Sequence, residues 1–142
     1  MKLSLGFGVE SQEVEIGDSQ IIGILEVNEV ELGLIGVEEV KRSLNNPIGT
    51  KRLKNIVKPG EKNVIITSDI TRPLPSYNII PSILDELYET GVNKEDIVVV
   101  IALGSHRAHT VEEKFQLLGQ RVINEVFKRL LTMQNMQLKM EA

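Results

Sequence analysis

Two short apolar segments, each followed by a polar loop, constrain the fold of this chain more than any other feature. Residues 64–67 and 97–103 consist almost wholly of aliphatic, mostly β-branched side chains with no polar alternation, which is typical of parallel strands buried on both faces. Between them, residues 76–88 follow a helical pattern. A strand, a helix and a second strand form a βαβ unit. The sequence therefore predicts an α/β domain with a mostly parallel sheet and flanking helices.

Both polar loops follow the carboxyl ends of these strands. In open parallel sheets, ligands bind where the carboxyl ends of the strands meet the following loops. Residues 68–76 include Asp69, Thr71 and Arg72, and residues 104–110 include both histidines of the chain. We therefore expect one site at this edge of the sheet, with Arg72 and His106 converging on one cleft.

The first loop allows two interpretations. Pro73 and Pro75 stiffen it, and the planar fork of donors on Arg72 suits a carboxylate or a phosphate. We expect Ser76 to cap the following helix, whose N-terminus would also favour an anion, although Pro81 can shift or kink that helix. Alternatively, Asp69 and Arg72 pair with each other and only fix the loop.

In the second loop, His106 is the candidate acid–base group, because a histidine titrates near neutrality. His109 is expected to be a surface residue beside a helix that starts with Thr110 as cap and Glu113 as its reciprocal partner. The spacing of His106 and His109 could suit two metal ligands, but no further ligand in the loop completes a shell. We therefore predict no metal site from these residues.

The rest of the chain contributes smaller elements. We expect a small amino-terminal β element, a connector and short helices before the first buried strand. Four basic side chains, Lys51, Arg52, Lys54 and Lys58, make one of these helices locally basic, which indicates a solvated face rather than an anion site. The expected ranges are residues 2–7, 13–16 and 21–27 for strands, 28–36 for the connector, and 37–44 and 50–57 for helices.

Composition limits the classes of partner. With 142 residues and 42% hydrophobic side chains, the chain can bury one core. A formal net charge of −4 and dispersed basic residues argue against nucleic acid as a partner. The absence of cysteine excludes disulfides and thiolate sites and is compatible with a reducing compartment. No apolar run approaches the roughly 20 residues of a membrane span, so we expect a cytoplasmic protein without a membrane partner.

Three segments together resemble a known family. Residues 43–49 (SLNNPIG), 68–76 (SDITRPLPS) and 102–110 (ALGSHRAHT) are similar, in matching order, to the amino-terminal region of the lactate racemase family. Members of that family use a nickel-pincer nucleotide cofactor and act on 2-hydroxy acids. The resemblance implies that Asp69, Ile70, Thr71 and Arg72 contact the cofactor, and that His106 is one of two catalytic acid–base residues.

The resemblance also sets limits on this chain. It covers residues 1–125, and in the family the lysine that tethers the cofactor, the histidine that ligates nickel and the second catalytic histidine lie beyond the end of this sequence. The resemblance thus implies an incomplete active site, a 2-hydroxy acid as substrate, and inactivity of this chain by itself. We also expect self-association through the surface that a missing carboxy-terminal part would leave uncovered.

Residues 126–142 are interpreted as a tail outside the family pattern. Four apolar residues are spaced among polar ones as in an amphipathic segment: Val126, Leu130, Met133 and Met140. The abrupt enrichment in methionine and glutamine suggests the hypothesis that this tail is a frame-shifted ending. Sequencing the gene past Ala142 tests this hypothesis. If no reading frame encodes a family-like continuation, the hypothesis is ruled out.

Two other classes of function remain open from the sequence. The first is a non-catalytic nucleotide- or anion-binding module that uses Arg72 and the neighbouring helix start. The second is an interaction domain that completes a site together with a separate carboxy-terminal chain. A downstream reading frame for the missing half would favour the racemase or the interaction domain over the binding module.

Overall fold

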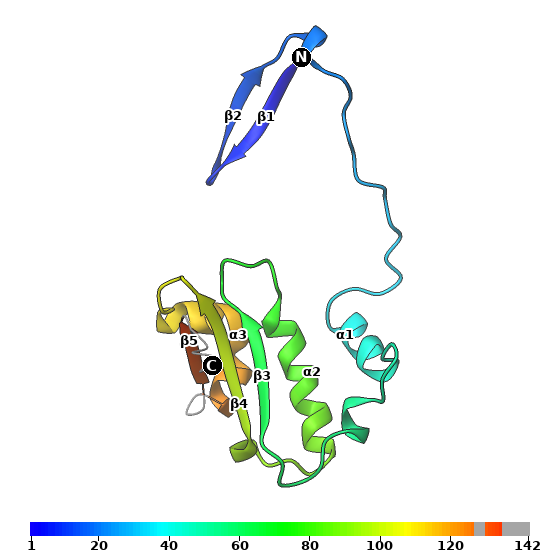
Figure 1. The fold of residues 1–142 in the computed structure, drawn as a ribbon, viewed down its shortest axis with the longest axis vertical. Helices are drawn as coiled ribbons and strands as arrows, with labels where there is room; N and C mark the ends of the chain where they lie inside the picture. Colours follow the sequence, from blue (N-terminus) through cyan, green and yellow to red (C-terminus); the bar gives the residue numbers. More distant parts are fainter. Residues whose placement is uncertain (127–129, 135–142) are drawn as a thin grey trace, which may run out of the picture. The chain divides into compact units, whose positions relative to one another are not determined.

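A computed structural model describes residues 1–126 and 130–134 of the chain. They form two compact units, residues 1–32 and the part from Gly33 onward (Figure 1).

The amino-terminal unit is a β-hairpin with a short extension. Strand β1 (Lys2–Phe7) pairs antiparallel with β2 (Glu10–Glu15), and the 3₁₀ turn η1 (Asp18–Gln20) follows. The charged amino terminus binds Asp18 at 2.9 Å. The prediction of a third strand over residues 21–27 is wrong, because that segment has no regular structure. No residue of this unit is buried, so an apolar segment here gains nothing from forming a strand.

The larger unit contains the predicted parallel sheet. Strands β3 (Asn63–Ser68) and β4 (Ile97–Gly104) pair in parallel, and α2 (Ser76–Glu89) connects them. A third parallel strand, β5 (Leu130–Gln134), lies on the other side of β4, which gives the order β3, β4, β5. The α/β fold class with a small amino-terminal β element is therefore confirmed.

Helices cover one face of this sheet. Helix α1 (Gly36–Asn45) packs on α2, which packs on α3 (Val111–Val126) (Figure 1). The core consists of alternate residues of β4 and the apolar faces of α2 and α3: Ile97, Val99, Ile101, Leu103, Ile80, Leu84, Leu87, Leu117, Leu118, Val122, Ile123 and Val126. The helix expected over residues 50–57 is reduced to the 3₁₀ turn η2 (Leu53–Asn55), and a second such turn, η3 (Lys94–Asp96), leads into β4.

The opposite face of the sheet is apolar and exposed on its two edge strands, whereas Val100 of the central strand is only 5% exposed. Val64 and Ile66 of β3 are 59% and 67% exposed, and Leu131 of β5 is 55% exposed. The register places Ile66 beside Val100 and Val100 beside Leu131, so these side chains share one face. Parallel sheets normally have both faces covered. The described residues thus cover only one of the two.

The start of α2 differs from the expectation. The N-cap position is Pro75, and no side chain caps it. Ser76 is instead the first helical residue, and its hydroxyl is buried against the hydroxyl of Thr67 at 2.6 Å. This bond connects the start of α2 to the end of β3. A capping bond from Ser76 to a backbone amide of α2 would not make that connection. Pro81 lies inside the helix.

Helix α3 is interrupted at Gly119. This residue has φ = 78° and ψ = 159°, so two helical segments meet there at a kink. A Cβ atom on Gly119 would lie 3.2 Å from the Cβ of Tyr77. Because a side chain would be strained by both the backbone and the contact, glycine lets α3 approach the first turn of α2.

The segment after α3 also differs from the expectation. Leu130–Gln134 adds a strand to the sheet, although we interpreted residues 126–142 as an amphipathic tail. Strand and helix periods are hard to tell apart in so short an apolar segment. The tail's other residues, apart from Val126 at the end of α3, lie outside the described part of the chain, and the frame-shift hypothesis stays a prediction.

Candidate active site

The predicted site residues meet at the carboxyl edge of the sheet. Asp69 directly follows β3, and His106 comes two residues after Gly104, the last residue of β4. Gly104 has φ = 60°, a left-handed conformation that lets the chain turn sharply there, and the His106 amide then donates to the Leu103 carbonyl at 3.0 Å. This turn brings the imidazole of His106 to the carboxylate of Asp69.

Asp69 and His106 form a hydrogen-bonded pair between Oδ2 and Nδ1. The hydroxyl of Thr71 donates to the other carboxylate oxygen of Asp69 at 2.7 Å. These bonds, with Thr71 contributing most and His106 next, hold the pKa of Asp69 below its usual range. Asp69 is therefore ionised near neutrality and accepts the Nδ1 proton of His106.

The two members of the pair differ in access. Asp69 is only 3% exposed, whereas the side chain of His106 is 47% exposed. A buried carboxylate that holds one nitrogen of an accessible imidazole fixes the ring and its tautomer, and so directs Nε2 toward proton transfer. A pocket of about 220 Å³ lies over the pair and is lined by Asp69, Ile70, Thr71, His106, Arg107 and His109.

The prediction that His109 is a surface residue is wrong. It is 8% exposed, and its Nε2 accepts a hydrogen bond of 3.2 Å from the Ile70 amide. The sequence gives no sign of this role, because a histidine next to a helix cap carries no pattern that indicates a tertiary contact.

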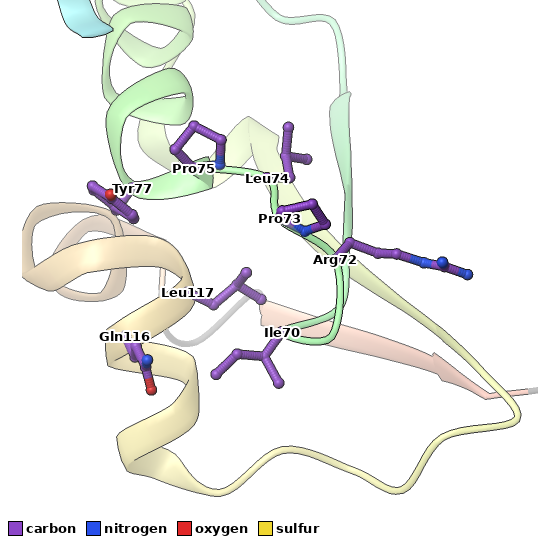
Figure 2. A pocket seen from close by; sticks show the side chains of 8 residues that line it. All are labelled: Ile70, Arg72, Pro73, Leu74, Pro75, Tyr77, Gln116 and Leu117. Carbon is purple, nitrogen blue, oxygen red and sulfur yellow. The ribbon is translucent and has the colours of Figure 1, made fainter. Parts of the chain in front are cut away.

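Arg72 does not line the pocket of His106, although the two were expected to converge on one cleft. It does not pair with Asp69, which binds His106 instead, and it lines a second pocket of about 410 Å³ together with Ile70 and Tyr77. In Figure 2 its side chain extends away from Tyr77 and Gln116. Ile70 borders both pockets. Arg72 and His106 thus share one edge of the sheet but line neighbouring pockets.

The guanidinium of Arg72 is available for an anion. It is exposed and has no hydrogen bond or ion pair with residues 1–126 or 130–134. The basic segment before β3 differs in this respect, because Arg52 pairs with the buried Glu86 and Lys54 lies 3.3 Å from Glu89. Arg72 therefore offers a charge beside the site that no described residue pairs with.

The cap of α3 is confirmed. The Glu113 amide donates to the Thr110 hydroxyl at 3.2 Å, and the Glu113 carboxylate accepts from the Thr110 amide at 2.8 Å. Arg107 adds a two-pronged ion pair to the same carboxylate, at 2.7 and 2.8 Å. This arrangement fixes the end of the loop that carries His106 and His109.

Together, the fold and this edge define a class: a parallel α/β domain whose carboxyl edge carries a carboxylate-oriented histidine next to an unpaired arginine. Among the described residues there is no group of three or more acidic or histidine side chains placed to hold a metal ion. No helix in the described part is long and apolar enough to cross a membrane.

Comparison with known proteins identifies the family. Residues 7–139 match the lactate racemase N-terminal domain family, and the chain belongs to that family. It is 36% identical over 129 residues to the lactate racemase of Thermoanaerobacterium thermosaccharolyticum, a match that spans 88% of this chain and 30% of the relative. It is 38% identical over 87 residues to the lactate racemase of Lactiplantibacillus plantarum, covering 61% of this chain and 20% of that protein.

A solved structure agrees with this assignment. The lactate racemase apoprotein from Thermoanaerobacterium thermosaccharolyticum superposes with a TM-score of 0.71 at 35% identity, over 93% of this chain and 30% of that chain. The present chain therefore spans about 30% of the length of this relative. The family match also runs past Glu125, where the sequence resemblance ended, as far as residue 139.

We predict that Glu113→Gln changes the pH dependence of stability. Arg107 and the Thr110 amide lower the pKa of Glu113 from 4.5 to about 2. Because the folded pKa is the lower one, the ionised carboxylate stabilises the folded state, fully above about pH 4.5, and this contribution is lost as the pH falls toward 2. Urea unfolding from pH 6 to pH 3 should therefore show a shallower loss of stability for the variant than for the wild type.

The exposed carboxylate of Glu95 supplies the control. Glu95→Gln changes the net charge equally but removes no such bonds, so its profile should parallel that of the wild type. Identical profiles for Glu113→Gln and the wild type would contradict the assigned ion pair.

Proposed function

We propose that this chain is the amino-terminal part of an isomerase that interconverts the stereoisomers of a lactate-like 2-hydroxy acid. Membership of the lactate racemase family supports the reaction class, and the lactate racemases that the chain resembles support the substrate class. The observation that carries the proposal is the pair between the buried carboxylate of Asp69 and the accessible imidazole of His106.

In this proposal His106 moves the proton of the substrate hydroxyl. The ionised Asp69 accepts the Nδ1 proton, so that Nε2 of the neutral ring carries the lone pair that acts as base. When Nε2 takes a proton, the positive charge forms next to the Asp69 carboxylate, which stabilises it. Thr71 keeps that carboxylate ionised and in place.

The residues present fit the anionic part of the nucleotide cofactor used by this family. The unpaired guanidinium of Arg72 suits a phosphate, and the start of α2, four residues further along, favours negative charge. The described residues offer no metal cluster, so ligands for nickel would come from elsewhere. When bound, the nickel-pincer nucleotide supplies the acceptor for the hydride that leaves C2 of the substrate.

We further propose that this chain is inactive alone. Inversion needs a proton carrier on each face of the substrate, and the site as described presents His106 on one side. The relatives have more than two thirds of their length outside the matched region, which is where a second carrier can reside.

The test is complementation. The chain is joined to the part of the Thermoanaerobacterium thermosaccharolyticum lactate racemase that follows the matched region, and it is supplied with the cofactor. We expect racemisation of lactate by the joined protein and none by the 142-residue chain. In the joined protein, His106→Ala should lower turnover by about 10²- to 10⁴-fold, the usual contribution of a general base.

Glu95→Gln, at the opposite end of β4, is the control and should leave turnover unchanged. Turnover by the 142-residue chain alone, lost on His106→Ala, would disprove the claim of inactivity. Full activity of the joined His106→Ala protein would disprove the role of His106. In that case the better interpretation of this chain is a non-catalytic anion-binding module, which the unpaired guanidinium of Arg72 supports.

We also propose that the chain self-associates through the exposed sheet face of Val64, Ile66 and Leu131. A second copy would cover the apolar side chains that the described residues leave in water. Sedimentation at 10 to 100 µM, on the order of ordinary dimer affinities, should show a species larger than a monomer. Ile66→Lys should shift it toward the monomer, whereas Ile48→Lys, in an exposed loop, should not. A monomeric wild type would refute the proposal.

A further inference from the structure

His109 links the two loops of the site at a second point. His106 binds Asp69, and His109 accepts from the amide of Ile70, the next residue. Two histidines three positions apart on one loop therefore hold two consecutive residues of the other. The first bond fixes a side chain, and the second fixes the backbone that carries it.

The second bond defines the state of the His109 ring. A ring nitrogen accepts a hydrogen bond only without its proton, so Nε2 is unprotonated and the ring is the neutral Nδ1–H tautomer. This Nδ1 is buried and has no hydrogen-bond partner among residues 1–126 and 130–134. Burying an unsatisfied donor is unfavourable.

This cost argues against a simple packing role. An apolar side chain of similar size would fill the same space without a buried, unsatisfied N–H. What an apolar side chain cannot supply is the acceptor for Ile70. The bond to Ile70 is therefore the feature that distinguishes histidine from an apolar residue at this position.

We propose that His109 is a positioning residue, which fixes the backbone at Ile70 so that the carboxylate of Asp69 faces the imidazole of His106. The bonds of Asp69 to Thr71 and of the Arg72 amide to the Asp69 carbonyl, at 2.7 and 3.2 Å, lie within the first loop. They shape that loop but do not set its position relative to the second loop, which the His109 bond does. The catalytic meaning of this role rests on the function proposed above, but the geometry can be tested without it.

Three variants separate the acceptor from the rest of the side chain. Glutamine places an oxygen about where Nε2 lies and keeps the acceptor. Leucine keeps the bulk of the side chain and removes the acceptor. Asparagine keeps a polar group, but only near the position of Nδ1. His109→Gln should therefore resemble the wild type, whereas His109→Leu and His109→Asn should not.

The readout is nuclear magnetic resonance of the imidazoles in the full chain, without cofactor or substrate. The chain has only two histidines, so each variant also assigns the signals. We expect His109 of the wild type as the Nδ1–H tautomer and a downfield Nδ1 proton of His106 bound to Asp69. In His109→Leu and His109→Asn, exchange of that His106 proton with solvent should rise at least tenfold, with wild-type behaviour retained in His109→Gln.

Thermal unfolding is measured in parallel. A structural role alone would change the unfolding midpoint and leave the His106 signal intact, so a wild-type His106 exchange rate in folded His109→Leu overturns the proposal. Observation of His109 as the Nε2–H tautomer overturns it as well, even if no variant folds. The histidine tautomer and the proton exchange rate are both measured without cofactor or substrate. If the racemase proposal fails, the expected values of both stay the same, so the two inferences are tested separately.

Discussion

The contact between Asp69 and His106 joins two residues that are far apart in sequence. The packing of the larger unit brings them together. Both residues leave the sheet at the same edge because β3 and β4 are parallel and in register from Asn63 and Ile97 onward. Burial of β4 against α2 and α3 fixes that register, since a slip by one residue would turn its apolar side chains out of the core. The site is thus a consequence of how the sheet is packed.

The loops are held more firmly than their polar composition indicates. Ser76 ties the start of α2 to β3 through Thr67, and Glu113 ties the second loop to α3. The kink at Gly119 brings α3 close to Tyr77, in the first turn of the helix that follows the first loop. A histidine that moves protons needs such support, because small errors of position cost much of the rate. Arg72, by contrast, is exposed, and its guanidinium has no partner among residues 1–126 and 130–134.

The one-sided sheet is consistent with the share of the relatives that this chain represents. It covers about 30% of the solved lactate racemase chain it resembles, and β3 and β5 both present apolar side chains on the face without helices. A parallel sheet gains most of its stability when both faces are covered. The uncovered face thus fits a chain that matches only part of its relatives' length.

Residue type and spacing were enough to predict the local elements with strong periodicity and the polar chemistry of the loops. Strands β3 and β4, helix α2, the cap at Thr110 and the candidacy of Asp69 and His106 all follow from residue type and spacing, because burial and capping are local demands. Which polar groups pair is visible only once the chain is folded. Asp69 binds His106 and not its neighbour Arg72. Ser76 meets Thr67, and the buried His109 accepts from the Ile70 amide. Such hydrogen bonds across loops depend on the relative placement of strands, which no local pattern encodes.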